Sequence, residues 1–137
     1  MQALKTYIVE DSAVIRENLI ATLEELVPVE VVGSAADEST AVHWLLQPEH
    51  PVDLVIVDIF LADGSGLGVL RSGQAMEPPI KMIVLSNYAT TDIRRKCLAL
   101  GAEAVFDKSN EIEALIAYCG RLAVHAPTAP GAGLRPN

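Results

Sequence analysis

Side chains that could carry out chemistry follow four of the short apolar runs in this sequence. Glu10 and Asp11 come after the first run, Asp58 after the third, Ser86 after the fourth and Lys108 after the last. Carboxylates that lie together repel one another unless a cation sits among them, and their hard oxygens suit Mg²⁺ or Mn²⁺. A carboxylate can also attack a phosphoryl group when positive charge neutralises the transferred oxygens. The residue types therefore predict a metal-assisted phosphoacceptor site, with one of the carboxylates as the nucleophile and Lys108 as a second source of positive charge.

The sequence between these positions predicts a regular alternation of strands and helices. Runs typical of β-strands, each followed by apolar residues at helical spacing, occur at residues 6–9, 29–34, 52–57, 80–85 and 104–106. Five β–α units with right-handed crossovers form an open, doubly wound α/β fold with a parallel sheet, whereas a barrel needs about eight units. Ligands bind at the carboxyl ends of the strands in such sheets, so the side chains named above should meet there.

Length and composition restrict the class of protein. The 137 residues suffice for one domain, and the net charge of −8 argues against direct nucleic-acid partners. No charged and apolar leader opens the chain, and no apolar stretch approaches the roughly 18 residues that span a bilayer, so a cytoplasmic protein without membrane partners is expected. Cys97 and Cys119 fall on the apolar stripes of predicted helices, which favours reduced core thiols. Residues 1–124 are predicted to be the folded domain, and the Pro- and Gly-rich residues 125–137 a disordered tail or a linker.

Glu10-Asp11, Asp58, Ser86 and Lys108, at these intervals in alternating strands and helices, resemble the receiver domain of two-component response regulators. The resemblance extends over roughly residues 4–123 and implies a flavodoxin-like sheet with strand order 2-1-3-4-5 in a stand-alone, chemotaxis-regulator-like switch. It implies that a histidine kinase or histidine phosphotransfer protein donates the phosphoryl group and that Asp58 accepts it. The chain would assist this transfer and the later hydrolysis without being an enzyme for another substrate. Output would pass to an unidentified protein through the surface of the fourth helix, fifth strand and fifth helix, from a monomer or a phosphorylation-dependent dimer.

Individual roles follow from the resemblance and from the chemistry of the side chains. By resemblance, Asp11, Asp58 and the backbone carbonyl of Phe60 would hold the Mg²⁺, and Glu10 would act mainly through metal-bound water. Ser86 can donate a hydrogen bond to a phosphoryl oxygen and draw its loop inward, which would make the site a switch.

Four positions depart from the receiver pattern, and one of them is Ala62, where receivers often have a proline. Val105 stands where receivers usually have an aromatic side chain, so readout is expected to rely on Ser86 and Tyr88. Ser109 replaces the usual proline after the lysine, where a cis bond without proline would cost about 3–4 kcal/mol. Phe60 stands where a polar side chain is frequent, and with Tyr88 it is expected to shield the phosphoryl group from water.

Several interpretations stay open from the residues alone. The basic run Arg94, Arg95 and Lys96 is either a partner-docking patch or a solvated helix face. Residues 63–66 lack the lysine and the spacing of a P-loop and are more typical of a turn before a helix. Two other classes of protein are disfavoured. A haloacid-dehalogenase-type enzyme needs a second aspartate where this chain has Phe60. A flavodoxin-like flavin carrier binds a flavin phosphate after the first strand, where Glu10 and Asp11 would repel it. A phosphorylation-independent pseudo-receiver and the receiver half of a DNA-binding regulator cut at its linker are two further candidates.

Overall fold

Five β-strands alternate with five α-helices along residues 3–125, the part of the chain that the computed structural model describes. The strands are β1 Leu4–Val9, β2 Val29–Ala35, β3 Leu54–Val57, β4 Met82–Ser86 and β5 Ala104–Asp107. The helices are α1 Ala13–Leu26, α2 Glu38–Leu45, α3 Gly66–Gln74, α4 Thr91–Ala99 and α5 Ile112–His125. The predicted alternation of strand and helix is confirmed.

The strands form one parallel sheet in the order β2-β1-β3-β4-β5, which confirms the predicted fold class. Val9 of β1 lies opposite Ala35 of β2 and Val57 of β3, and Val57 in turn lies opposite Val84 of β4. These residues stand at or near the ends of their strands. The segments that follow β1, β3 and β4 therefore leave the sheet at the same edge, where the predicted site residues begin.

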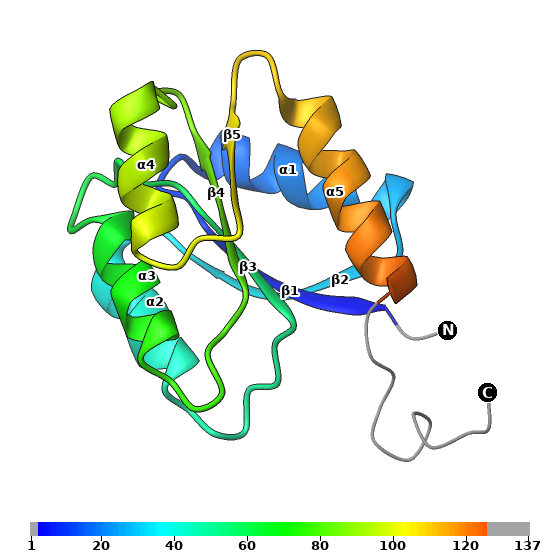
Figure 1. Cartoon of the computed structure of the whole chain (residues 1–137). Coiled ribbons are helices and arrows are strands. Elements are labelled where there is room, and N and C mark those ends of the chain that lie inside the picture. The colour runs from blue at the N-terminus through cyan, green and yellow to red at the C-terminus, as the bar shows by residue number, and fades with distance from the viewer. Residues whose placement is uncertain (1–2, 126–137) are drawn as a thin grey trace.

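Helices cover both faces of the sheet, with α1 and α5 on one side and α2, α3 and α4 on the other (Figure 1). Alternate residues of β3 point to opposite faces: Ile56 packs in the core under α1 and α5, and Val57 in the core under the other helices. This strand is buried on both sides, as its continuous apolar run predicts. Cys97 and Cys119 are free and buried, one in each core, and burial raises the pKa of Cys119 to about 11.

The ends of several elements differ from the ranges predicted from the sequence. β3 begins at Leu54, and beside its first residue the Asp53 carboxylate accepts the N–H of Lys5 at 2.8 Å. β4 begins at Met82 because the N–H of Ile80 donates to a carbonyl at the end of α3. Helix α5 continues to residue 125, and residues 126–137 of the predicted tail lie outside the described residues. Within residues 3–125, none of the helices combines the length and the apolar character that a membrane-spanning helix needs.

Candidate functional site

Three carboxylates meet at the carboxyl edge of the sheet. Glu10 and Asp11 follow β1 and Asp58 follows β3, and each offers one oxygen within 4.8 Å of the others. Backbone hydrogen bonds hold two of them there, since Glu10 N–H donates to the carbonyl of Ala35 at 2.9 Å and Asp58 N–H to that of Val9 at 3.0 Å. Glu10 and Asp58 are buried, with 3% and 7% of their surface exposed. This set of hard, mutually repelling oxygens fits a divalent cation such as Mg²⁺.

The Lys108 ammonium group brings positive charge to this cluster from the segment after β5. Its Nζ donates to Asp58 Oδ2 at 2.8 Å and also to Glu10 Oε1. Burial raises the pKa of Glu10, and the hydrogen bond from Lys108 opposes that rise. Burial by itself lowers the pKa of Lys108, but the hydrogen bonds with Asp58 and Glu10 outweigh it and leave the pKa raised. Lys108 therefore stays charged beside Asp58.

The loop between β3 and α3 borders the site on the side of Asp11. Ala62 N–H donates to Asp11 Oδ2 at 2.7 Å, and Phe60 N–H donates to Asp58 Oδ1 at 3.2 Å. A cavity of about 150 Å³ opens here, and its lining includes the three carboxylates, Lys108 and Phe60. The loop thus brings the backbone of Phe60 next to the carboxylates.

The turn expected before α3 is present at residues 63–66. Gly64 has a φ of +83°, a conformation that side chains with a Cβ rarely adopt. Ser65 caps α3, because its hydroxyl accepts the N–H of Leu67 at 3.0 Å. A Cβ on Gly66 would lie 2.2 Å from the carbonyl oxygen of Asp58, so the close approach of α3 to Asp58 requires glycine here.

Ser86 ends β4 in a fully buried position. Its hydroxyl accepts the N–H of Tyr88 at 3.1 Å, and its carbonyl accepts the N–H of Lys108 at 2.9 Å. The ring of Tyr88 meets the ring of Phe60 edge to face, with centroids 5.1 Å apart. Both rings line the cavity beside Asp58, and both are exposed, so they form its outer wall.

The two departures near Lys108 have simple structural outcomes. Val105 is packed in the core and lies opposite Val84 of β4. The bond between Lys108 and Ser109 is trans, and Glu77–Pro78 is the one cis peptide bond among the described residues. The Asp107 carboxylate accepts the N–H of Ser109 at 2.7 Å and directs the chain into the turn before α5.

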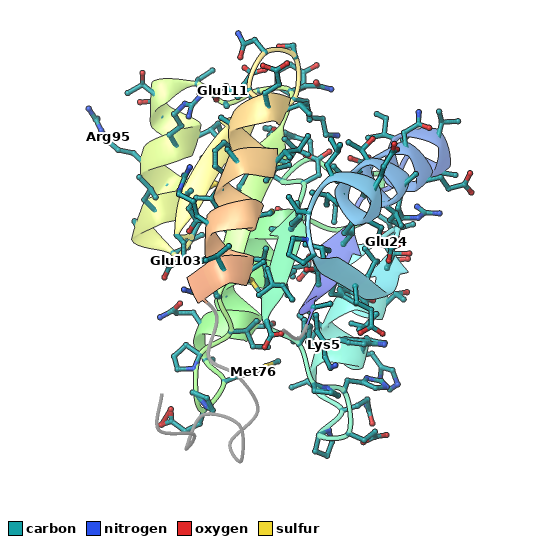
Figure 2. The ribbon with its side chains drawn as sticks, turned by 90° about the vertical axis from the view of Figure 1, so that its right-hand side faces the viewer. Lys5, Glu24, Met76, Arg95, Glu103 and Glu111 are labelled. Atoms are coloured by element: carbon teal, nitrogen blue, oxygen red, sulfur yellow. The ribbon has the colours of Figure 1, made fainter. Side chains whose placement is uncertain are left out.

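The basic run on α4 consists of one partly buried residue, Arg94, and two exposed residues. Arg94 donates to backbone carbonyls of the loop before α4 and of β5, both at 2.9 Å, and to the Glu111 carboxylate at 2.8 Å. Arg95 and Lys96 are exposed, and Figure 2 shows Arg95 pointing outward from α4. Arg94 is therefore engaged in internal contacts, and a docking surface on α4 can use only the other two residues. The pairing of Arg94 with Glu111 was not predicted from the sequence, because the two residues are 17 positions apart and no sequence motif links them.

Replacing Arg94 by Met is expected to lower the free energy of unfolding by about 1–2 kcal/mol, because two backbone carbonyls lose a charged donor. Arg95→Met is the matched control and should change it by less than about 0.5 kcal/mol. Urea denaturation followed by Trp44 fluorescence measures both changes. The hydrogen bond from Arg94 lowers the pKa of the Glu111 carboxyl. The pair therefore stabilises the fold above the pKa that Glu111 has in the unfolded chain, and this stabilisation is lost as the pH falls through the lower pKa of Glu111 in the folded protein. Equal denaturation midpoints for the two variants would contradict the internal role of Arg94.

Comparisons with known proteins give a consistent result. The family described as response regulator receiver domain matches residues 6–119. A "Probable transcriptional regulatory protein" of Picosynechococcus is 34% identical over 120 residues, which are 84% of this chain and 47% of that protein. A protein-glutamate methylesterase/protein-glutamine glutaminase of Rhodopseudomonas palustris is 32% identical over 99% of this chain and 38% of its own length. The crystal structure of the response regulator domain of Thermotoga maritima CheB has a TM-score of 0.78 at 21% identity, covering 93% of this chain and 100% of that one.

This chain belongs to the response regulator receiver domain family, because the family match spans far more than half of its residues. The family belongs to two-component signal transduction, and the predicted receiver identity is confirmed. The solved structure, at 21% identity, supports the fold alone. The chain spans less than half the length of the two curated relatives described above.

Proposed function

We propose that this chain accepts a phosphoryl group from a phosphohistidine donor onto Asp58, with Mg²⁺ or Mn²⁺ as the cofactor. One observation carries the proposal: the oxygens of Glu10, Asp11 and Asp58 lie within 4.8 Å of one another, and Lys108 binds Asp58 at 2.8 Å. A carboxylate cluster that could hold a metal ion, a carboxylate that could act as the nucleophile and a fixed positive charge thus lie together. Membership in the receiver family supports the same chemistry.

Each group in the cluster has a proposed role that follows from its position. Asp11, Asp58 and the Phe60 carbonyl would hold the metal ion, and Glu10 would bind it through water. When bound, the ion supplies charge stabilisation for the transferred oxygens. An Asp58 carboxylate oxygen forms the new bond to phosphorus while the bond from phosphorus to the histidine nitrogen of the donor breaks. Lys108, already beside Asp58, is placed to pair with a phosphoryl oxygen.

The proposed switch begins at Ser86. Its hydroxyl accepts from Tyr88 and keeps its own proton, so it can donate to a phosphoryl oxygen at the same time. A shift of Ser86 would move the loop between β4 and α4 and alter the surface formed by α4, β5 and α5. That surface is the proposed contact with a downstream protein. The donor would be a histidine kinase or a histidine phosphotransfer protein, and the receiver a cytoplasmic monomer or a phosphorylation-dependent dimer.

The lengths of the relatives favour a second candidate for the output. Both curated relatives are more than twice as long as the segment that they share with this chain, and one is named as a transcriptional regulatory protein. In this second candidate, the chain is the receiver part of a longer regulator and residues 125–137 lead to its output domain. The acceptor chemistry at Asp58 is the same in both candidates.

Intact-protein mass after incubation with acetyl phosphate tests the acceptor chemistry. The expected result is a phosphoryl adduct that requires Mg²⁺ and is removed by hydroxylamine, as an acyl phosphate is. EDTA in place of Mg²⁺ is the control. The absence of an adduct with both acetyl phosphate and a histidine phosphodonor would favour a pseudo-receiver that acts without phosphorylation.

Phe60→Asn is expected to shorten the lifetime of the phosphorylated state several-fold. The Phe60 and Tyr88 rings form the outer wall of the cavity, and a smaller polar side chain would admit water to the acyl phosphate. Hydrolysis is measured as decay of the adduct by mass after the donor is removed. Leu98→Asn, a change at an exposed apolar residue on α4, is the control. An unchanged decay rate in Phe60→Asn would rule out shielding by this ring.

A further inference from the structure

We infer that Glu38, the first residue of α2, is a positioning residue that sets the affinity of the site for Mg²⁺. It would do so by fixing the loop between β3 and α3. The inference rests on the proposed function, because it concerns the metal ion bound beside Asp58. Glu38 comes from a different β–α unit and is separated from its loop partner by 27 residues.

Two hydrogen bonds join Glu38 to the loop. Its Oε1 accepts the N–H of Ser65 at 2.9 Å, and its own N–H donates to the carbonyl of Asp63 at 3.3 Å. The side chain is half-buried at the first turn of α2, where the helix dipole favours a carboxylate. A single residue of α2 therefore holds the turn on both sides of its positive-φ glycine.

The contact continues across the loop to the metal site. Ser65 lies opposite Phe60 in an isolated antiparallel bridge, supported by a 2.9 Å backbone hydrogen bond between the residues next to them. Phe60 N–H in turn donates to Asp58 Oδ1 at 3.2 Å. A continuous series of contacts thus runs from Glu38 through Ser65 to Phe60, whose carbonyl is a proposed metal ligand.

Two glycines make room for the Glu38 side chain. A Cβ on Gly68 would lie 1.9 Å from Glu38 Oε2, and a Cβ on Gly64 would lie 2.5 Å from the Glu38 Cβ. Gly68 is inside α3 and has no positive φ that requires glycine, and alanine is the better helix former. The close approach of Glu38 is therefore the constraint that an alanine at position 68 would violate.

The dependence of metal affinity on such a contact has a physical basis. Residues that hold metal ligands in place affect affinity strongly, and their loss typically weakens metal binding roughly 10- to 100-fold. Glu38 also carries a negative charge close to the site, so its removal alone would not separate positioning from electrostatics. Gly68→Ala solves this problem, because it displaces the Glu38 carboxylate from the loop without removing any charge from the chain.

Isothermal titration of the full chain with MgCl₂ tests the inference. Glu38→Ala and Gly68→Ala should each weaken Mg²⁺ binding roughly 10-fold. Glu38→Gln should have a smaller effect, because its amide oxygen can still accept from Ser65. Asp63→Asn removes an exposed charge from the same loop and should leave the affinity nearly unchanged. Glu38→Ala and Gly68→Ala disrupt the same contact, the one between the Glu38 carboxylate and the N–H of Ser65. The double variant Glu38→Ala/Gly68→Ala should therefore bind Mg²⁺ no more weakly than either single variant.

The outcomes separate this inference from the proposed function. Wild-type affinity in Gly68→Ala and Glu38→Ala, with Mg²⁺ bound normally by the wild-type chain, would overturn the role of Glu38 alone. Equal weakening in Glu38→Ala and Asp63→Asn, with Gly68→Ala unchanged, would also overturn it in favour of a charge effect. A wild-type chain that binds no Mg²⁺ would overturn the proposed metal site together with the inference. Thermal unfolding without Mg²⁺ shows whether each variant is folded. If Glu38→Ala or Gly68→Ala does not fold, Glu38→Gln is the mildest substitution with which Mg²⁺ affinity can still be compared.

Discussion

Asp58→Asn is expected to abolish the phosphoryl adduct that the wild-type chain forms with acetyl phosphate and Mg²⁺. The substitution keeps the size of the side chain but replaces a carboxylate nucleophile with a neutral amide that does not attack phosphorus. It also leaves only Glu10 and Asp11 as carboxylates for the metal ion. Both effects act in the same direction, so the loss should be complete. Intact mass measures the adduct, and peptide mapping of the wild-type adduct locates it.

Asp63→Asn is the control for this prediction, because Asp63 is an exposed acid in the loop after β3. That variant should form the adduct as the wild-type chain does. Circular dichroism should show that both variants keep their secondary structure. Retention of the adduct in Asp58→Asn would mean that another carboxylate accepts the phosphoryl group, and Glu10 and Asp11 would be the next residues to substitute.

Lys108→Met should slow adduct formation about 100-fold at saturating Mg²⁺, since removing one group that stabilises developing charge commonly costs this much. It should also lower the free energy of unfolding of the metal-free protein by about 3 kcal/mol. The side chains of Lys108, Glu10 and Asp58 are only 9%, 3% and 8% exposed, so two carboxylates would remain buried without their counter-charge. The pKa of Glu10, already raised by burial, should rise further in this variant.

Mg²⁺ separates the two effects of Lys108→Met. The ion returns positive charge to the carboxylates, so the difference in stability should shrink as Mg²⁺ is added, whereas the slow transfer should persist. Urea denaturation with and without Mg²⁺ measures stability, and the time course of the adduct measures transfer. Lys96→Met, at an exposed position on α4, is the control. A wild-type transfer rate in Lys108→Met would show that Lys108 takes no part in the transfer. Unchanged metal-free stability would show that Lys108 does not balance the buried charges of Glu10 and Asp58.

Much of the fold follows from local patterns in the sequence. The apolar run that becomes β3 and the helical spacing around it are visible without any tertiary information, because burial on both faces demands continuous apolar residues. The strand order was inferred from the resemblance to receivers rather than from periodicity, and the sheet confirms it. The first residue of β3 does not follow from such patterns: the apolar run begins at Val52, whereas the strand begins at Leu54.

The sequence alone also determined which residues approach the site. Glu10, Asp58 and Lys108 each stand just after a strand, and a parallel sheet brings such positions to one edge whatever the details of packing. Their convergence therefore needs only element order and topology. The turn at residues 63–66 was likewise predicted from its composition, because glycine and serine favour turns and helix caps.

Only the tertiary structure decided which side chains hold these groups in place. Arg94 binds Glu111 from 17 residues away, and Glu38 binds the N–H of Ser65 from 27 residues away. The clash that excludes a Cβ at Gly68 is likewise a property of two elements in contact. A hydrogen bond of this kind depends on the distance and angle between two packed elements, and a charged side chain has many possible partners, including water. Sequence patterns therefore place the reactive groups at the sheet edge, whereas packing selects the contacts that fix their geometry.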